Sequence, residues 1–365
     1  MSHSFKDILD REHHSHEDLV KMLSATGEER KLLFAKAAEI KEKYVGKKVY
    51  YRGLIEFSNV CGKNCYYCGI RKGNRNVKRY NLSDDEILAA AKFALDNNYG
   101  SIALQSGELE SDFFSDRVEK LLKKIMEMSD NRLGITISLG EQSEEVYKRW
   151  FEAGARRYLL RIESSDPDLY MKLHPDDGHH KFEYRVNCLN SLKNVGYQTG
   201  TGVMIGLPWQ TLDNLASDLE FMRDFDIDMC GMGPYIEHAD TPFIAHKESL
   251  MPLLSRFDLS LKMIASLRII MKDINIAAAT ALQAIDPVGR EKGVMVGANI
   301  VMPNITPGKY RDSYQLYDNK PCTDDSEEDC KSCLEARLGL TNSDIGYGEW
   351  GDSKHYDRRR AERIN

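Results

Sequence analysis

The chain has 365 residues, of which 42% are hydrophobic, and 50 Lys and Arg against 57 Asp and Glu give it a net charge of −7. This size allows a large core, and the acidic balance argues against a broad nucleic-acid-binding face. The sequence has no apolar run long enough to span a bilayer, and its N-terminus lacks the apolar core of a signal peptide. We therefore expect a cytoplasmic protein with no membrane partner, whose eight cysteines are reduced thiols or metal ligands.

Strand and helix patterns alternate along most of the chain. Residues 1–50 are predicted to form a helical N-terminal extension, residues 51–308 a barrel, and residues 309–365 an irregular tail. The predicted helices of the barrel are 84–98, 114–128, 144–153, 168–173, 184–195, 211–225, 259–271 and 287–294. The predicted strands are 51–57, 101–106, 134–138, 157–161, 198–204, 228–233, 275–279 and 298–301. Eight strands alternating with helices predict one complete (β/α)8 TIM barrel.

Three cysteines follow the first predicted strand directly. Cys61, Cys65 and Cys68 have the spacing C-x3-C-x2-C, and the next cysteine is far away at Cys188. A structural zinc site normally takes four ligands, whereas three thiolates suit three corners of a cubane iron–sulfur cluster and leave its fourth iron open. The alternatives are a zinc knuckle or a set of inert buried thiols. Because active sites of such barrels lie at the C-terminal ends of the strands, a catalytic cluster is expected at this loop.

The spacing of these cysteines, with Tyr67 as the aromatic residue before the last one, resembles the radical S-adenosylmethionine (SAM) superfamily. The resemblance implies a 4Fe–4S cluster whose open iron is chelated by the amino and carboxylate groups of SAM. It also implies that one electron from an external donor, passed through the cluster, breaks a carbon–sulfur bond of SAM and releases a 5′-deoxyadenosyl radical. Tyr67 is accordingly expected beside the cofactor.

Polar side chains lie at the ends of the third and fourth predicted strands. Thr136 and Ser138 are two residues apart and therefore share a face of their strand, and the same spacing relates Arg161 to Glu163. If these faces point into the barrel, two hydroxyls and two charges line its interior. The alternatives are packed hydroxyls bonded to backbone and a structural Arg–Glu pair, since charges inside a barrel are costly unless paired or functional.

The radical SAM resemblance also implies which residues hold SAM. Gly107 and Glu108 match the motif that accepts hydrogen bonds from the SAM amino group, and Arg185 is expected to bind the SAM carboxylate. Glu163 is expected at the ribose hydroxyls or the methionyl part. The segment from Met204 through Gly-Leu-Pro resembles the element that carries the nucleoside. The complete set of expected cofactor-binding residues is Tyr67, Gly107, Glu108, Ser138, Glu163, Arg185 and Met204.

A second cysteine trio lies in the tail. Cys322, Cys330 and Cys333 belong to a strongly acidic segment. We predict that they bind a second iron–sulfur cluster, and the alternative is a group of exposed thiols without a partner. A cytoplasmic protein tolerates such a group poorly.

Further motifs narrow the resemblance to the HydE family, the radical SAM maturases of FeFe-hydrogenase. They include Ile55-Glu-Phe-Ser-Asn-Val-Cys61, Leu104-Gln-Ser-Gly-Glu108, Ser138-Leu-Gly-Glu141 and the tail trio. This resemblance implies a small organometallic substrate, an iron that carries carbon monoxide, cyanide and cysteine, made by the maturase HydG. It implies HydF as a further partner and a tail cluster without catalytic duty. Biotin synthase and methylornithine synthase are similar more distantly.

Residues near the strand ends are expected to line the substrate cavity. Arg161 would complement the negative charge of cyanide and carboxylate, and Gln105 and Thr136 would donate hydrogen bonds. The full catalytic set predicted is Gln105, Thr136, Ser138, Arg161, Met229, Thr280, Met302 and Tyr310. Two other functions stay open, namely a radical SAM reaction on an amino-acid skeleton and an iron–sulfur scaffold without catalysis.

Overall fold

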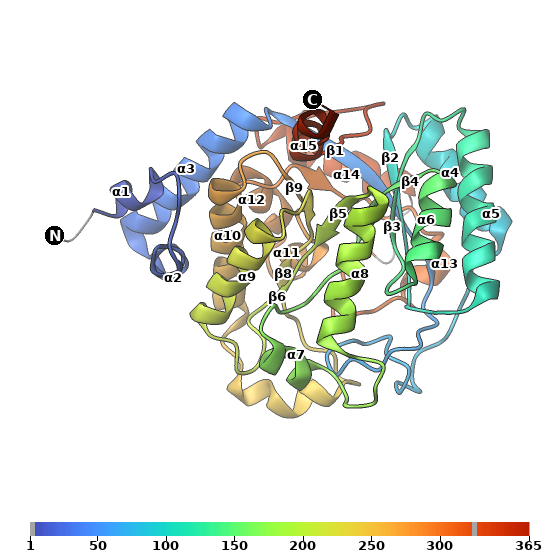
Figure 1. The fold of residues 1–365 in the computed structure, drawn as a ribbon, viewed down its shortest axis with the longest axis horizontal. Coiled ribbons are helices and arrows are strands. Elements are labelled where there is room, and N and C mark those ends of the chain that lie inside the picture. The colour runs from blue at the N-terminus through green and yellow to red at the C-terminus, as the bar shows by residue number, and fades with distance from the viewer. Residues whose placement is uncertain (1–3, 323–326, 365) are drawn as a thin grey trace.

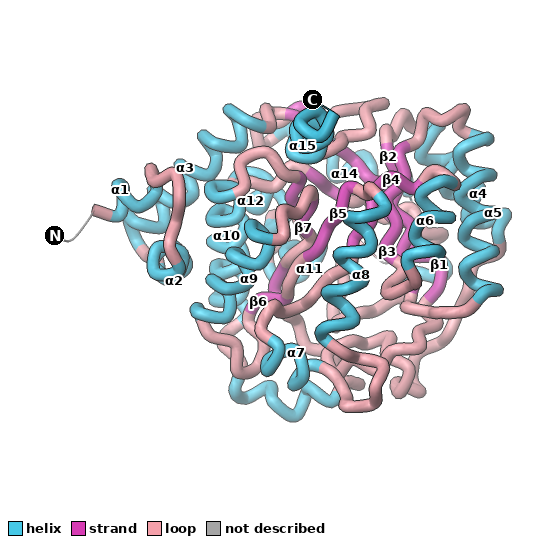
Figure 2. The backbone as a smooth tube through the Cα atoms, in the orientation of Figure 1, coloured by secondary structure: helices cyan, strands magenta, loops and turns pink. Residues whose placement is uncertain are grey.

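The computed structural model describes residues 4–322 and 327–364. Strands form a curled sheet in the centre, and helices pack around its outer face (Figures 1 and 2). None of the helices in the described part of the chain combines the length and the apolar character that a membrane crossing requires. The loops that follow the strands gather at the lower edge in both figures, and helix α15 lies at the opposite end.

The sheet is parallel throughout, with strand order β10-β1-β2-β3-β4-β5-β7-β9. Beyond it, β6 and β8 form a separate parallel pair, and β11 pairs with the start of β1. The bounds are β1 Lys48–Ser58, β2 Ser101–Ser106, β3 Gly134–Ser138, β4 Ala155–Leu159, β5 Gln198–Thr201, β6 Met204–Ile205, β7 Met229–Cys230, β8 Gly233–Pro234, β9 Asn275–Ile276, β10 Ile300–Val301 and β11 Asp344–Ile345. The predicted parallel α/β sheet is therefore confirmed.

The complete barrel is not confirmed, because the order of paired strands is open between β9 and β10. At this seam the described residues form an isolated parallel bridge between Ala277 and Ile300. The side chain of Asn299 takes the place of a ladder partner: its Oδ1 accepts from the backbone N–H of Ile276 at 2.9 Å, and its Nδ2 donates to Asn275 Oδ1 at 2.7 Å. Side-chain hydrogen bonds thus link β9 and β10, which among the described residues share a single bridge and no regular ladder.

The helices that follow the strands cover the outside of the sheet (Figure 1). They are α4 Asp84–Asp96, α5 Asp112–Met128, α6 Glu144–Glu152, α7 Pro167–Leu173, α8 Phe182–Val195, α9 Leu212–Asp224, α10 Leu253–Ile270, α11 Thr280–Ile285 and α12 Gly289–Met295, with a 3₁₀ helix η1 at Pro242–Ser249. Two of the α-helices differ from the prediction by more than two residues, and η1 was not predicted. Helix α10 begins six residues before the predicted start at 259, directly after Pro252, and α11 was not expected at all.

Both ends of the chain contain regular structure. The N-terminal extension consists of α1 Phe5–Leu9, α2 His16–Ser24 and α3 Gly27–Tyr44, of which α2 contacts α9 and α3 contacts α10. The prediction of an irregular C-terminal tail is wrong. The tail contains α13 Gly308–Arg311, α14 Glu327–Gly339 and α15 Lys354–Ile364. Its helices find charged partners in the rest of the chain, since Arg337 pairs with Glu291 and Arg359 with Asp228.

Helix α15 is held at the barrel base by a cluster of charges. His355 lies between two carboxylates, with Nε2 2.6 Å from Asp226 Oδ1 and Nδ1 2.9 Å from Asp273 Oδ1. Arg359 from the same helix pairs with Asp228 at 2.7 Å. Although burial acts to lower it, hydrogen bonds to Asp226 and Asp273 raise the pKa of His355 to about 9. The imidazolium is therefore charged at neutral pH and contributes to the docking of α15.

This histidine predicts a pH-dependent stability. A folded-state pKa raised from 6.5 to about 9 gives stabilisation that is fully present below pH 6.5 and is lost as the pH rises to about 9 and above. At about 1.4 kcal/mol per pKa unit, its full size is on the order of 3 kcal/mol. Denaturant unfolding across this range should show the loss in the wild-type chain, and the His355→Gln variant should be less stable at neutral pH and lack this component. An identical pH profile for both proteins would contradict the assignment.

Candidate active site

A cavity of about 240 Å³ opens at the C-terminal ends of the strands, where the cysteine loop meets the loops after β2, β3 and β4. It brings together residues that are far apart in sequence. All three cysteines of the first trio and all seven residues expected to bind the cofactor line it. These residues are Cys61, Cys65, Cys68, Tyr67, Gly107, Glu108, Ser138, Glu163, Arg185 and Met204.

The cysteine loop leaves the end of β1 and presents three free thiols to the cavity. Cys61, Cys65 and Cys68 are partly exposed, and the backbone N–H of Glu108 donates to Cys61 Sγ at 3.3 Å. Burial raises the pKa of all three thiols, that of Cys68 to about 12. Neighbouring thiols that line one cavity fit a metal centre, since a bound metal makes the thiolate the stable form.

Two glycines allow the loops to approach each other closely. A Cβ at Gly107 would lie 2.3 Å from the carbonyl oxygen of Val60 and 2.8 Å from Cys61 Cβ, so only glycine lets the end of β2 run against the cysteine loop. Gly140 has a φ of +81°, and a Cβ there would lie 1.9 Å from Glu108 Cγ. The two glycines together fix Glu108 beside the cysteines.

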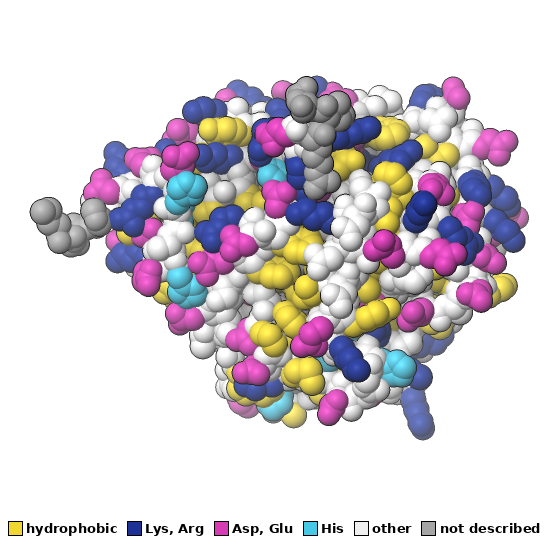
Figure 3. Space-filling view, viewed as in Figure 1, with side chains coloured by type: hydrophobic (Ala, Val, Ile, Leu, Met, Phe, Trp, Pro, Cys, Tyr) yellow, Lys and Arg dark blue, Asp and Glu magenta, His cyan; other side chains and the backbone are white. Residues whose placement is uncertain are grey.

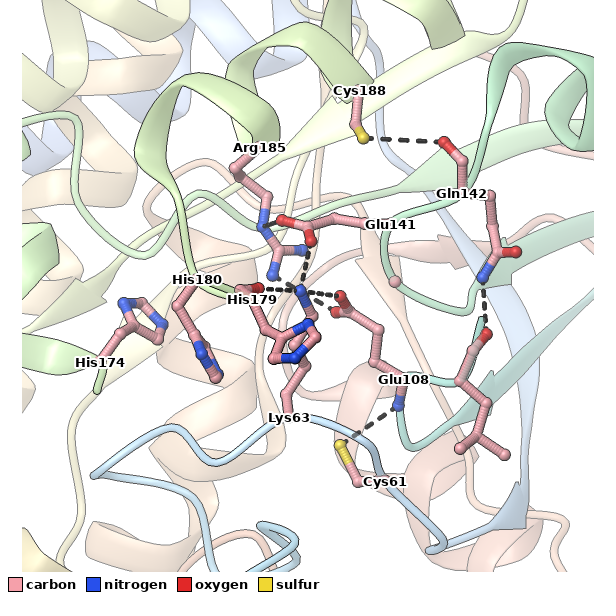
Figure 4. Close-up of polar contacts among 12 residues, drawn as sticks. Cys61, Lys63, Glu108, Glu141, Gln142, His174, His179, His180, Arg185 and Cys188 are labelled. Atoms are coloured by element: carbon pink, nitrogen blue, oxygen red, sulfur yellow. Dashed lines mark hydrogen bonds and ion pairs between the residues drawn. The ribbon is translucent and has the colours of Figure 1, made fainter. Parts of the chain in front are cut away.

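Four charged side chains form a buried network beside the cysteine loop (Figure 4). Arg185 lies 3.3 Å from Glu108 and 2.8 Å from Glu141, while Lys63 lies 3.3 Å from Glu108 and also pairs with Glu141. Burial acts to raise the pKa of Glu108, but Arg185 and Lys63 hold it below its ordinary value. For Glu141 burial prevails, and its pKa is raised. The network is neutral as a whole and places a guanidinium and a carboxylate at the cavity.

Sequence reasoning missed two members of this network, Lys63 and Glu141. The available signal was their position in the motifs: Lys63 lies inside the cysteine loop, and Glu141 ends the Ser138-Leu-Gly-Glu141 segment. Because Lys63 lies between Cys61 and Cys65, its side chain is expected near the three thiols.

Arg161 and Glu163 form an ion pair at the cavity wall. Arg161 NH2 lies 2.9 Å from Glu163 Oε2 and donates to the carbonyl oxygen of Val203 at 2.9 Å. Glu163 has a φ of +65°, a conformation that residues other than glycine adopt rarely and that is often held at functional sites. Burial raises the pKa of Glu163, in spite of the charge of Arg161. The two residues therefore form the Arg–Glu ion pair that was the alternative to a functional role. Both side chains also line the cavity.

A smaller cavity of about 50 Å³ lies deeper in the sheet. Gln105, Ser138 and Leu159 line both cavities, so the two are adjacent. Thr136 and Ser138 both face this interior, as their spacing predicts, and Thr136 Oγ1 accepts from Arg157 Nε at 2.9 Å. The predicted catalytic residues that line it are Gln105, Thr136, Ser138, Met229 and Met302.

Two predicted catalytic residues, Thr280 and Tyr310, line neither cavity. Tyr310 belongs to α13, where its hydroxyl donates to Glu86 Oε1 at 3.0 Å and its ring stacks on Tyr80. Thr280 begins α11, and its neighbours Ala279 and Ala281 reach the larger cavity instead. The structure therefore does not bring these two residues to either cavity, and their catalytic role stays a prediction.

The tail trio is only partly described. Cys322 is half-buried and near Arg290 NH2 at 3.7 Å, Cys333 is exposed, and the side chain of Cys330 lies outside the described residues. Among the described side chains, no three His, Cys, Asp or Glu meet as ligands of one metal ion. A cluster does not need such convergence, because each thiolate binds a different iron. Cluster binding in the tail therefore stays a prediction.

Comparisons with known proteins agree with this site. The family model of the Radical SAM superfamily matches residues 55–222. The HydE subunit of the FeFe-hydrogenase maturase of Thermotoga maritima is 45% identical over 322 residues, which cover 88% of both chains. A 3-methylornithine synthase of Methanosarcina acetivorans is 28% identical over 89% of both chains.

Solved structures show the same fold. Methylornithine synthase (PylB) superposes with a TM-score of 0.77 at 24% identity over 98% of this chain and 99% of the other. The maturase HydG of Carboxydothermus hydrogenoformans gives a TM-score of 0.78 at 21% identity over 94% and 79%. By the extent and identity of the match to the Thermotoga protein, and by the cysteine-lined cavity, this chain is a radical SAM enzyme and belongs to the HydE family of FeFe-hydrogenase maturases.

Proposed function

We propose that this enzyme cleaves SAM reductively and uses the 5′-deoxyadenosyl radical on a small iron synthon, bearing carbon monoxide, cyanide and cysteine, during assembly of the FeFe-hydrogenase di-iron site. The observation that carries the proposal is the single cavity lined by Cys61, Cys65 and Cys68 together with the expected SAM-binding residues. A 4Fe–4S cluster bound to the three thiolates would supply the electron for the cleavage.

Around such a cluster, the charged network can orient a zwitterionic ligand. Glu108, whose pKa is lowered by Arg185 and Lys63 against the effect of burial, is charged at neutral pH and can accept from an ammonium group. Arg185 presents a planar guanidinium that can bind a carboxylate in a bidentate manner. Glu163 is held in a strained conformation in the lining of the same cavity and can accept from hydroxyl groups. These roles explain why both signs of charge are buried here.

The residues that would hold the synthon line the larger cavity. Arg161 Nε is buried and hydrogen-bonded to no described atom, so it is an available donor for an anionic ligand. Gln105 and Ser138 line both cavities and add neutral donors. A protected cavity of this kind also limits the access of water to a radical.

Several finer points belong to the same proposal. HydG would supply the synthon, HydF would be a further partner, and an external one-electron donor would reduce the enzyme in the cytoplasm. Cys322, Cys330 and Cys333 would hold a second iron–sulfur cluster that catalysis does not need. The strands β9 and β10 would complete a (β/α)8 barrel through the Asn299 seam.

The cleavage half of the proposal has a direct test. The protein is reconstituted anaerobically with iron and sulfide, reduced, and given SAM. We expect 5′-deoxyadenosine and methionine in equal amounts, and faster release when the synthon is present. An intact cluster that yields no 5′-deoxyadenosine would favour the scaffold function instead.

A further inference from the structure

Residues 71–79, here called the basic loop, carry an unusual concentration of positive charge. Five of these nine residues are Lys or Arg and none is acidic, although the whole chain has a net charge of −7. The loop joins the cysteine loop to α4 and lies at the lower edge of Figure 1, in pale blue. Figure 3 shows Lys and Arg side chains projecting at this lower edge. A local positive surface on an acidic protein suggests an acidic partner.

The basic loop is bonded directly to the cysteine loop. The backbone N–H of Lys72 donates to the carbonyl oxygen of Lys63 at 2.8 Å, and Asn74 Nδ2 donates to the carbonyl oxygen of Gly69 at 2.7 Å. Arg79 donates to the carbonyl oxygens of Asn59 at 2.6 Å and Ile70 at 2.7 Å. The loop therefore has a fixed position beside the three cysteines, and its place relative to a cluster does not depend on a binding partner.

The basic residues of the loop have two different roles. Arg79 donates to backbone carbonyls of the cysteine loop, and Arg71 donates to Asn64 Oδ1 at 2.8 Å. Lys72, Arg75 and Lys78 are instead exposed, and none of them forms an ion pair with a residue that the structure describes. Within residues 4–322 and 327–364, three positive charges are therefore left without an ion-pair partner.

The surroundings of these charges suit a small redox interface. Val60, next to Cys61, is 37% exposed and offers an apolar contact at the edge of the cysteine loop. Among the residues that the structure describes, the carboxylate bonded to the basic loop is that of Asp240, which accepts from Asn76 Nδ2 at 2.9 Å. One carboxylate against three exposed cations leaves the surface positive. Electron-transfer encounters bury little area and depend on such charges for fast association.

We propose that Val60 and the exposed cations Lys72, Arg75 and Lys78 form the docking surface for a small acidic one-electron carrier protein. The inference rests on the proposed function, because it concerns the reduction of the cluster held by the cysteine loop. In this step the carrier is oxidised by one electron and the cluster is reduced by one, with no exchange of atoms. The position of the loop beside the cysteines keeps the electron path short.

The test compares two triple variants with equal charge changes. One is Lys72→Glu/Arg75→Glu/Lys78→Glu. The matched control is Lys120→Glu/Lys124→Glu/Lys148→Glu, which changes exposed and likewise unpaired lysines on the outer helices α5 and α6. Binding of an acidic ferredoxin to each reconstituted protein is measured at low and at high salt. We expect roughly ten-fold weaker binding for the basic-loop variant, wild-type binding for the control, and binding that weakens with salt.

A second readout separates docking from catalysis. Formation of 5′-deoxyadenosine is driven either by reduced ferredoxin or by photoreduced deazaflavin, a small reductant that needs no docking surface. The basic-loop variant should form 5′-deoxyadenosine slowly when ferredoxin is the reductant and at the wild-type rate when deazaflavin is. Equal effects of the two triple variants, or wild-type ferredoxin binding by the basic-loop variant, would overturn the inference. If wild-type protein makes no 5′-deoxyadenosine with deazaflavin, the proposed function fails, and the binding measurement still decides whether the surface exists.

Discussion

The Cys65→Ala variant is expected to lose both the iron–sulfur cluster and SAM cleavage. Three thiolates bind three of the four irons and leave one open. Removing one thiolate leaves the cluster bound by two. The described residues that line the cavity include no fourth cysteine and no histidine that could replace the lost ligand. Loss of an outer-sphere partner already costs about 10- to 100-fold in metal affinity or activity, so loss of a direct ligand should exceed roughly 100-fold.

Iron and sulfide analysis, electron paramagnetic resonance of the reduced protein and 5′-deoxyadenosine formation measure this loss. Cys188→Ala is the matched control, because Cys188 is a buried thiol on α8 that lines neither cavity and contacts the carbonyl oxygen of Gln142 at 3.7 Å. It should retain iron and cleavage. A Cys65→Ala protein that still binds a 4Fe–4S cluster and cleaves SAM would refute the assignment of the metal site.

The parts of the fold that the sequence predicts well are those with a regular pattern. The predicted strands 101–106 and 134–138 have the same bounds as β2 and β3, because their buried apolar runs end where polar strand-end residues begin. The predicted strand 198–204 is instead divided into β5 and β6. The chain leaves the central sheet after Thr201, and β6 then pairs with β8. The pattern of apolar residues does not indicate this change of partner strand.

The site was predictable where residues belong to one short segment, and less so where distant segments meet. The three cysteines share a loop, so their spacing alone locates them. The pairing of Lys63 with Glu141 joins residues 78 positions apart and depends on the close approach that Gly107 and Gly140 permit. Tyr310 is a residue that the sequence places in the cavity and the structure does not. Its position beyond the last strand favours the cavity, but in α13 its hydroxyl donates to Glu86.

The Arg185→Met variant is expected to be strongly destabilised and to lose SAM binding. Arg185 is buried between Glu108 and Glu141, and its removal leaves the buried carboxylate of Glu141 and the partly buried one of Glu108 with Lys63 as their cation. Removing one partner of a buried ion pair costs about 3–5 kcal/mol because the remaining charge is uncompensated. The pKa of Glu141, already raised by burial, should rise further, so the stability deficit relative to wild type should shrink as the pH falls and the carboxyl becomes protonated.

Two further variants separate stability from ligand binding. Arg185→Met/Glu141→Gln removes one charge of each sign, so denaturant unfolding should show most of the lost stability restored, while calorimetric titration of the reconstituted protein should still show no SAM binding. Arg185→Lys keeps the positive charge but lacks the planar guanidinium group. This variant should fold nearly as the wild type does and bind SAM more weakly. If the double variant bound SAM with wild-type affinity, Arg185 would be a structural cation of the network and the SAM carboxylate would have another partner.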